Sequence, residues 1–198
     1  MTAPKSILVL NGHPAPTSLS KSLSEAYIAG AQAAGHELRI HHLHDMNFDP
    51  DYGFAGYDNP KRLEPDLEAF LADLEWCQHL VVTMPLWWGG MPAKLKGLVD
   101  RAFLPGRTFS TRKTNLFGVP TPLMTGRSAR VILTTDTPAF FLRLMYGNAI
   151  KRTLRGQVLG FIGLRPLRYT QFAPATHAKS DKVETWQGIV KTLGTRGA

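Results

Sequence analysis

The chain has 198 residues, of which 43% are hydrophobic and 19% are charged, and this predicts a single globular domain over residues 1–198. The net charge of +8 is uneven, because residues 1–100 hold 7 Lys/Arg and 12 Asp/Glu whereas residues 101–198 hold 16 and 3. The charges form no block and accompany no recognition motif, and no apolar run approaches the ~18 residues of a membrane span, so neither a nucleic-acid partner nor an integral membrane segment is expected.

The first predicted strand, Ser6–Asn11, runs into a loop rich in Gly, Pro, Ser and Thr. A helix with one apolar face follows and ends at Gly35. Unpaired N–H groups at a helix N-terminus favour phosphate, and Thr17, Ser18 and Ser20 would add hydroxyl donors, although serines before a helix are also ordinary caps. The loop matches neither the Walker A pattern nor G-x-G-x-x-G, which disfavours ATP hydrolysis and a dinucleotide Rossmann site.

The second predicted strand, Glu37–Leu43, is expected near one edge of the sheet. His42 and His44 could share a face there, but without a third ligand nearby no metal site is expected. The loop that follows, from Asp45 to Pro60, is long, aromatic and acidic, and loops of this length are more often functional or interfacial than idle.

A helix beginning at Pro65 carries apolar residues on one face, and Cys77 falls on that face. A lone cysteine excludes an intramolecular disulfide, and on an apolar face it is expected to be inert. The N-terminus also lacks the pattern of a signal peptide. These features together predict a reducing, cytoplasmic location.

The third predicted strand, Leu80–Met84, is uncharged, as expected for a buried strand of a parallel sheet. Pro85 ends it, two glycines permit a tight turn, and a helix with apolar residues at 3.6-residue spacing runs from Pro92 to Phe103. Trp87 and Trp88 therefore lie on a loop at the carboxyl end of a strand, where open α/β sheets bind ligands. They could hold a planar ligand, or they could fill the core or a dimer interface.

The remaining chain is predicted to be less regular at first, with an irregular surface excursion over residues 104–128. The elements expected after it are a fourth strand (Ala129–Thr134), a hydroxyl-rich TTDTP loop (Thr134–Pro138), one or two helices (Phe140–Phe161) interrupted near Gly147 and Gly156, a fifth strand (Leu167–Phe172) and a last helix (Ser180–Leu193). Alternating strands and helices predict an α/β fold with a parallel sheet. The loops after strands one, three and four would converge if the strand order is 2-1-3-4-5, as in flavodoxin-like folds.

Three segments resemble the flavodoxin-like NAD(P)H:quinone oxidoreductase family. The first is the loop with His13 and the S-L-S of Ser18–Ser20. The second is L-x-D-M-N-F-D-P, from Leu43 to Pro50. The third is the longer motif P-L-W-W-G-G-M-P-A-x-L-K-G-x-x-D-R-x-F, from Pro85 to Phe103. The resemblance implies a homodimeric flavoprotein with a three-layer sandwich fold, in which NAD(P)H reduces the flavin and the flavin reduces a quinone-like electrophile. FMN is expected, with FAD as the alternative, and either NADPH or NADH as cosubstrate.

The same resemblance implies roles for three loops. The first would hold the flavin phosphate with His13, Ser18, Leu19 and Ser20. The second would carry the isoalloxazine ring on Pro85, Leu86, Trp87, Trp88 and Gly89. The third would close over the ring with Thr134, Thr135, Asp136 and Thr137.

The third loop departs from the family pattern, which is a glycine-rich T-T-G-G followed by a Tyr and a His that act as donors. Asp136, Thr137 and Pro138 stand here instead, so Tyr146 is the best remaining donor, unless it belongs to the core, and Asn148 and Arg143 are weaker candidates. Two other functions stay open. One is a flavodoxin-type electron carrier, although such carriers are typically acidic and this chain has a pI of 9.8. The other is an ancillary flavoprotein subunit of a potassium-efflux transporter.

Overall fold

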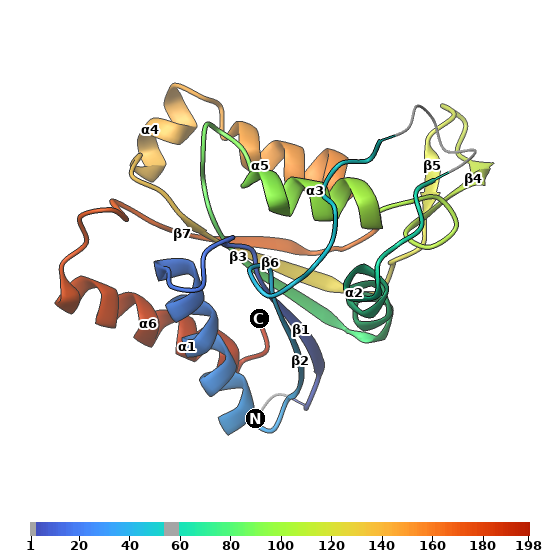
Figure 1. Ribbon diagram of the computed structural model, residues 1–198. Helices are drawn as coiled ribbons and strands as arrows, with labels where there is room; N and C mark the ends of the chain where they lie inside the picture. Colours follow the sequence, from blue (N-terminus) through green and yellow to red (C-terminus); the bar gives the residue numbers. More distant parts are fainter. Residues whose placement is uncertain (1–2, 54–59) are drawn as a thin grey trace.

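The computed structural model describes residues 3–53 and 60–198 as a three-layer α/β sandwich (Figure 1). The central sheet consists of five parallel strands in the order β2-β1-β3-β6-β7. Their bounds are β1 Ser6–Asn11, β2 Glu37–His42, β3 His79–Pro85, β6 Ser128–Thr134 and β7 Leu167–Phe172. The five strands lie close to the predicted ranges, and their parallel pairing follows from the helical crossovers between them.

Helices cover both faces of this sheet. On one face α1 and α6 pack side by side, and on the other α2, α3 and a run of short helices enclose the larger core (Figure 1). The helices are α1 Leu19–Ala33, α2 Pro65–Trp76, α3 Ala93–Ala102, α4 Ala139–Leu144, α5 Ala149–Thr153, the π-helix η1 Leu154–Val158 and α6 Ser180–Thr195. Within the described ranges, no helix combines the length and apolarity needed to cross a membrane.

Two glycines explain the close approach of α1 and α6. A Cβ on Gly30 would lie 2.0 Å from the carbonyl oxygen of Lys191, and one on Gly194 would lie 2.1 Å from that of Tyr27. Any side chain at either position would force the helices apart, so small residues here set the thickness of this layer.

Two parts of the second half differ from the predictions. Residues 104–128 contain a β-hairpin, β4 Phe109–Thr114 and β5 Pro120–Pro122, where an irregular excursion was expected. It was missed because its residues are mostly polar or proline and largely exposed, so no apolar alternation marks it. The hairpin takes the labels β4 and β5, and the sheet order is therefore 2-1-3-6-7 rather than the consecutive 2-1-3-4-5.

The predicted helical stretch Phe140–Phe161 is divided into α4, α5 and η1. The expected break at Gly147 is present, because this glycine has φ +54° and the next residue, Asn148, has φ 52°. The expected interruption at Gly156 is instead a change of helix type, since this glycine lies within the π-helix.

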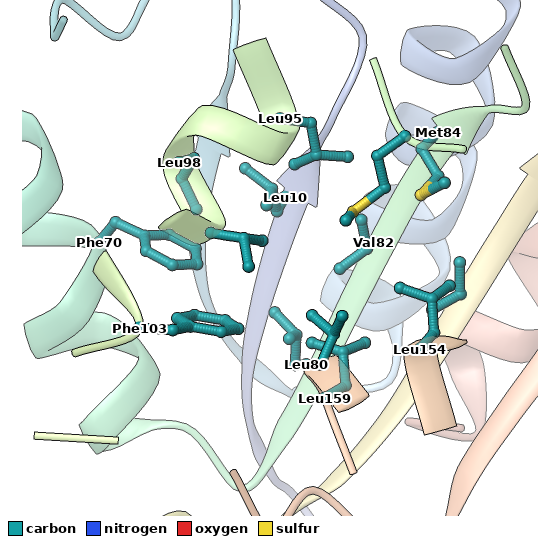
Figure 2. Close-up of a pocket in the computed structure, with 14 residues that line it drawn as sticks. Leu10, Phe70, Leu80, Val82, Met84, Leu95, Leu98, Phe103, Leu154 and Leu159 are labelled. Carbon is teal, nitrogen blue, oxygen red and sulfur yellow. The ribbon is translucent and has the colours of Figure 1, made fainter. Parts of the chain in front are cut away.

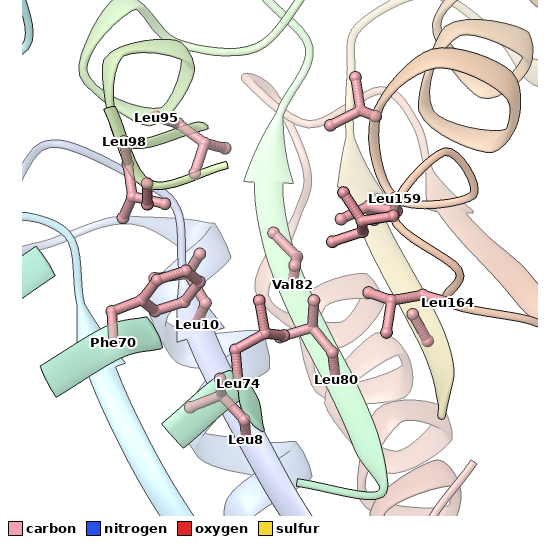
Figure 3. Close-up of a cluster of buried hydrophobic side chains, with 14 of the residues drawn as sticks. Leu8, Leu10, Phe70, Leu74, Leu80, Val82, Leu95, Leu98, Leu159 and Leu164 are labelled. Atoms are coloured by element: carbon pink, nitrogen blue, oxygen red, sulfur yellow. The ribbon is translucent and has the colours of Figure 1, made fainter. Parts of the chain in front are cut away.

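The larger core is an apolar cluster that includes Leu8, Leu10, Leu80 and Val82 from β1 and β3 (Figure 3). Within it lies a small cavity of about 20 Å³ between α3 and the chain around η1, and the side chains that point into it in Figure 2 are all apolar. Without a polar group to orient a ligand, this cavity belongs to the core. Cys77 is also buried in this cluster, and burial raises the pKa of its thiol to about 11, which disfavours the reactive thiolate.

The long loop between β2 and α2 is described over residues 45–53 and from Pro60, and residues 54–59 lie outside the described part. Its first half packs against α3, where a Cβ on Gly97 would lie 2.4 Å from the Cβ of Pro50. Lys94 Nζ also donates to the carbonyl oxygen of Met46 at 2.7 Å. These contacts give the described half of the loop a packing role.

Candidate functional site

The loops after β1, β3 and β6 meet at the carboxyl edge of the sheet, because these three strands are parallel neighbours (Figure 1). A cavity of about 200 Å³ lies between them. It is lined by His13, Leu19, Ser20, Pro85, Leu86, Trp87, Thr134, Thr135, Asp136, Ala175 and Thr176. The first nine were predicted, whereas the two residues of the loop after β7 were not.

The first loop presents polar groups at the start of α1. Ser20 Oγ lies 3.3 Å from Thr134 Oγ1 and so joins α1 to the end of β6. Ser18 does not line the cavity, because its Oγ accepts from the backbone N–H of Lys21 at 3.1 Å and caps the helix. For Ser18, the capping alternative describes what its side chain does.

His13 is held in one tautomer. Its Nδ1 accepts the backbone N–H of Ala15 at 3.0 Å, so the proton of the neutral ring resides on Nε2. Burial is the main cause that lowers the pKa of His13, and the charge of His44 lowers it further. The ring is therefore neutral at pH 7 and presents an N–H donor.

The aromatic loop is a tight turn closed by two hydrogen bonds. Trp87 N donates to Gly90 O at 3.1 Å, and Gly90 N donates to Trp87 O at 2.8 Å. Trp88 and Gly89 both have positive φ, 49° and 76°, as a type I′ turn requires. A tryptophan in the left-handed region is strained, and strain of this kind concentrates at functional sites.

Both tryptophans project from the core. Trp87 is 44% exposed and Trp88 is fully exposed, so the alternative that they fill the core of this chain is wrong. The ring of Trp87 meets that of His13 edge to face, with 5.3 Å between the centroids. This contact connects the first loop with the second, which the sequence places more than seventy residues apart.

In the third loop, Asp136 stands where the family pattern has glycine, and its side chain forms hydrogen bonds that a glycine could not. Asp136 Oδ1 accepts the backbone N–H groups of Ala175 and Thr176 at 3.0 and 2.7 Å, and its Oδ2 accepts the hydroxyl of Thr176 at 2.6 Å. The Thr176 hydroxyl is the main cause that lowers the pKa of Asp136, with the two backbone donors adding to it. The ionised carboxylate thus fastens the loop after β7 to the wall of the cavity.

A second cavity of about 560 Å³ continues from the first, because Leu86, Thr135 and Asp136 line both. Its other lining residues are Trp88, Gly89, Thr137, Leu142, Tyr146, Asn148, Ala149 and Ile150. Tyr146 is 60% exposed, so the alternative that it belongs to the core is wrong. Arg143 is not among the lining residues. The two cavities form one trough, polar beside α1 and more apolar beside α4 and α5.

Asn148 is the least satisfied polar residue of this trough. Its Oδ1 is closed to solvent and has no hydrogen-bond partner in the described chain. Its backbone has φ 52°, a conformation that asparagine tolerates better than most residues. The sequence signal for it was the Gly-Asn pair that interrupts a helical pattern.

If this cavity holds the flavin that the family resemblance implies, Asp136→Ala should weaken FMN binding roughly tenfold, because the loop at Ala175 and Thr176 loses all three bonds to the carboxylate. Titration of the apoprotein with FMN, followed by fluorescence quenching, measures this. Glu184→Ala removes an exposed carboxylate from α6 and is the matched control. Unchanged affinity in Asp136→Ala would show that this loop is not part of the binding wall.

Comparison with known proteins agrees with this geometry. The family described as Flavodoxin-like fold, Flavodoxin_2, matches residues 5–191. The chain is 29% identical over 129 residues to NAD(P)H dehydrogenase (quinone) 1 of Cavia porcellus, covering 56% of this chain and 47% of that protein. It is 32% identical over 97 residues to an FMN-dependent NADH:quinone oxidoreductase of Cereibacter sphaeroides, covering 49% and 45%. The chain thus spans about half the length of these curated relatives.

Among solved structures, Smu.1420 from Streptococcus mutans superposes with a TM-score of 0.79 at 25% identity, over 96% of this chain and 98% of that one. The sheet order, the three converging loops and the match over residues 5–191 agree with one another. The chain therefore belongs to the Flavodoxin_2 family of flavodoxin-like folds.

Proposed function

We propose that the protein is a flavin-dependent NAD(P)H oxidoreductase that acts on a quinone-like electrophile. The observation that carries the proposal is the trough itself, which offers a polar end beside the N-terminus of α1 and an aromatic, apolar end beside α4. A bound flavin would supply the chemistry, taking hydride from the nicotinamide and passing it to the acceptor. The names of the relatives from Cavia porcellus and Cereibacter sphaeroides support the same reaction class.

The residues that line the trough fit a flavin whose phosphate lies at the polar end and whose ring lies at the aromatic end. At the polar end, the Nε2–H of His13, the hydroxyl of Ser20 and the start of α1 suit a phosphate, with Leu19 beside them and Ser18 shaping the helix end. The ring would lie against the aromatic loop, along Pro85, Leu86, Trp87, Trp88 and Gly89. Thr134, Thr135, Asp136 and Thr137 would close it from the other side.

We propose FMN rather than FAD as the flavin. The polar end of the trough accounts for one phosphate. The FMN dependence of the Cereibacter sphaeroides relative supports this choice. The basic second half of the chain would suit the additional phosphate of NADPH, and NADH is the alternative.

A visible spectrum of the purified protein tests the proposal. We expect flavin absorption bands, release of FMN on denaturation, and oxidation of NADPH or NADH that depends on an added quinone. A protein that retains and takes up neither FMN nor FAD would refute it. Flavin binding without turnover by either nucleotide would instead favour an electron carrier.

We propose that Tyr146 and Asn148 contact the substrate, because both line the apolar end of the trough and Tyr146 is exposed there. Asn148→Gly keeps the left-handed backbone but removes the amide, so we expect the KM for the quinone to rise about tenfold while FMN affinity is unchanged. Tyr146→Phe should lower kcat by at least about tenfold if the hydroxyl donates a proton. Steady-state kinetics separates the two effects, and Arg143→Met, outside the trough lining, is the control. Wild-type parameters in both variants would remove these residues from the site.

We also propose a homodimer in the cytoplasm. A partner subunit would cover exposed apolar side chains beside the trough, including Phe140, Leu144, Met145 and Trp88. Light scattering during size-exclusion chromatography tests this, with twice the mass of the chain expected. A monomer at all concentrations would contradict it.

A further inference from the structure

A second group of unusual residues lies at the amino end of the sheet, away from the trough. The buried polar atoms there without a hydrogen-bond partner in residues 3–53 and 60–198 include Nε of Arg130, Nε2 of His79 and the hydroxyl of Tyr27. The exposed fractions of these residues are 6%, 2% and 0%. Unsatisfied buried groups are rare in folded proteins and cost stability, so this cluster requires an explanation.

The three side chains come from different elements but face the same layer. His79 is the first residue of β3 and is the Cα partner of Ser128, the first residue of β6. Arg130 follows two positions later on β6, so it lies diagonally across from His79 on the same face of the sheet. Tyr27 reaches this face from α1, where it belongs to the core between the sheet and the α1–α6 layer.

Arg130 is a buried cation without a carboxylate. Its Nη1 donates to Thr170 Oγ1 at 2.7 Å, and no ion pair joins it to any acidic side chain of the described chain. Its Cα partner across β6 and β7 is Arg168, a second positive charge. Burial lowers the pKa of Arg130, the neighbouring Tyr27 opposes this effect, and the charge of Arg168 lowers the pKa further. Both like-charge pairing and burial are unfavourable, and a counter-anion would relieve both.

His79 contributes a donor and no charge. Its Nδ1 lies 2.7 Å from Ser128 Oγ, and an anion at Nε2 would select the tautomer in which Nδ1 accepts from that hydroxyl and Nε2 carries the ring proton. Burial, and then the charges of Lys5, Arg130 and Arg168, lower the pKa of His79 to about 3, so the ring is neutral at pH 7. The free positions of Arg130, His79 and Tyr27 are therefore all able to donate. Water has two lone pairs, whereas an anion can accept from all three.

We propose that Tyr27, His79 and Arg130 form a buried binding site for a small anion of halide size, distinct from the trough. Its size follows from the enclosure, because each of the three unpartnered atoms exposes less than 1 Å² to solvent. A phosphate or a nucleotide would need an open cavity. Such an anion binds only the folded chain and stabilises it by mass action.

Thermal unfolding in sodium chloride and in sodium gluconate at equal ionic strength tests the site. Once chloride exceeds its Kd, we expect the melting temperature to rise by about 3–5 °C for each tenfold increase, with no such rise in gluconate. A crystal grown in bromide should show an anomalous peak between the three side chains. Equal melting temperatures in both salts, or stabilisation by phosphate alone, would overturn the proposal.

Variants of the cluster separate the site from general salt effects. Arg130→Met removes the buried charge but keeps much of the volume, so the chloride dependence should be lost and stability in gluconate should be equal or higher than that of the wild type. Tyr27→Phe removes one donor and keeps the packing, and it should weaken the apparent chloride affinity about three- to tenfold. Arg112→Met, an exposed arginine of the hairpin, is the control and should keep the full dependence. Chloride stabilisation that persists in both cluster variants would refute the assignment.

Discussion

Replacing Trp87 and Trp88 with alanine together should abolish flavin retention during purification while lowering the melting temperature by only a few degrees, about 2–4 °C. The structural cost is small because Trp88 is fully exposed and Trp87 is about half exposed, so little apolar surface is lost from the folded chain. The binding cost is large, because a stacked indole contributes both buried area and a favourable ring contact. A loss of about 3 kcal/mol corresponds to an increase in Kd of more than 100-fold.

Two single-site variants serve as controls for this result. Trp186→Ala removes a buried indole that stacks on Phe172 at 5.1 Å, and it should lower stability by about 3–5 kcal/mol. Phe117→Ala removes an exposed aromatic residue from the hairpin and should change neither property. Absorbance of the purified proteins and their melting curves give both readouts. Retained flavin in the double variant, or a loss of stability as large as that of Trp186→Ala, would contradict the role of the aromatic loop.

The turn geometry gives a further comparison within the same loop. Trp88→Gly removes the side chain and also the strain of a positive φ, so it should be at least as stable as the wild type. If Trp88→Gly still retains flavin, then Trp87 carries the ring contact. If it loses flavin while melting higher, then the strained indole contributes to binding at the expense of stability.

Much of the trough could be predicted because its loops are marked by local chemistry. Pro85 and Gly89 mark the end of an apolar strand, and hydroxyl side chains follow β1 and β6. Because loops at the carboxyl ends of neighbouring parallel strands lie close together, these signals predict nine lining residues of the first cavity. The exposure of the tryptophans could not be predicted in this way. Apolarity alone does not distinguish a buried indole from one that lines an open cavity.

What escaped prediction depends on tertiary contacts. The pairing of Asp136 with Ala175 and Thr176 joins segments about forty residues apart, and nothing in TTDTP indicates the partner. Ser18 reads equally well as a phosphate donor or as a cap, and only the bond to Lys21 decides for its side chain. The missed hairpin has the same origin, because its polar strands are defined by pairing rather than by an apolar face.

Replacing Arg101 with methionine should lower the free energy of unfolding by about 3–5 kcal/mol, because the guanidinium is buried and both of its terminal nitrogens donate hydrogen bonds. It donates to both carboxylate oxygens of Glu64, at 3.2 and 2.8 Å, and to the carbonyl oxygens of Asp49 and Arg62. Only 1% of its side chain is exposed. The described parts of the long loop between β2 and α2 are thus fastened to α3 from within, and methionine would leave the carboxylate and two carbonyls without this donor.

Arg107→Met is the matched control, because Arg107 also pairs with two carboxylates, those of Glu68 and Glu75, but its side chain is 38% exposed. Such an exposed pair should contribute only about 0–1 kcal/mol. Denaturant unfolding measures both variants, and a similar loss in the two would show that burial does not strengthen the Arg101 pair.

The pH dependence should report the same contact. Burial tends to raise the pKa of Glu64, but the Arg101 bonds outweigh it, and the pKa is held below the usual 4.5. The stability from this pair is therefore complete above that unfolded value and is lost as the pH falls through the lower, folded value. The difference in stability between wild type and Arg101→Met should accordingly be constant near neutral pH and shrink as the pH falls below about 4. A difference that stays constant down to pH ~2 would mean that Arg101 stabilises the fold through its packing and the two carbonyls, with no contribution from the charge of Glu64.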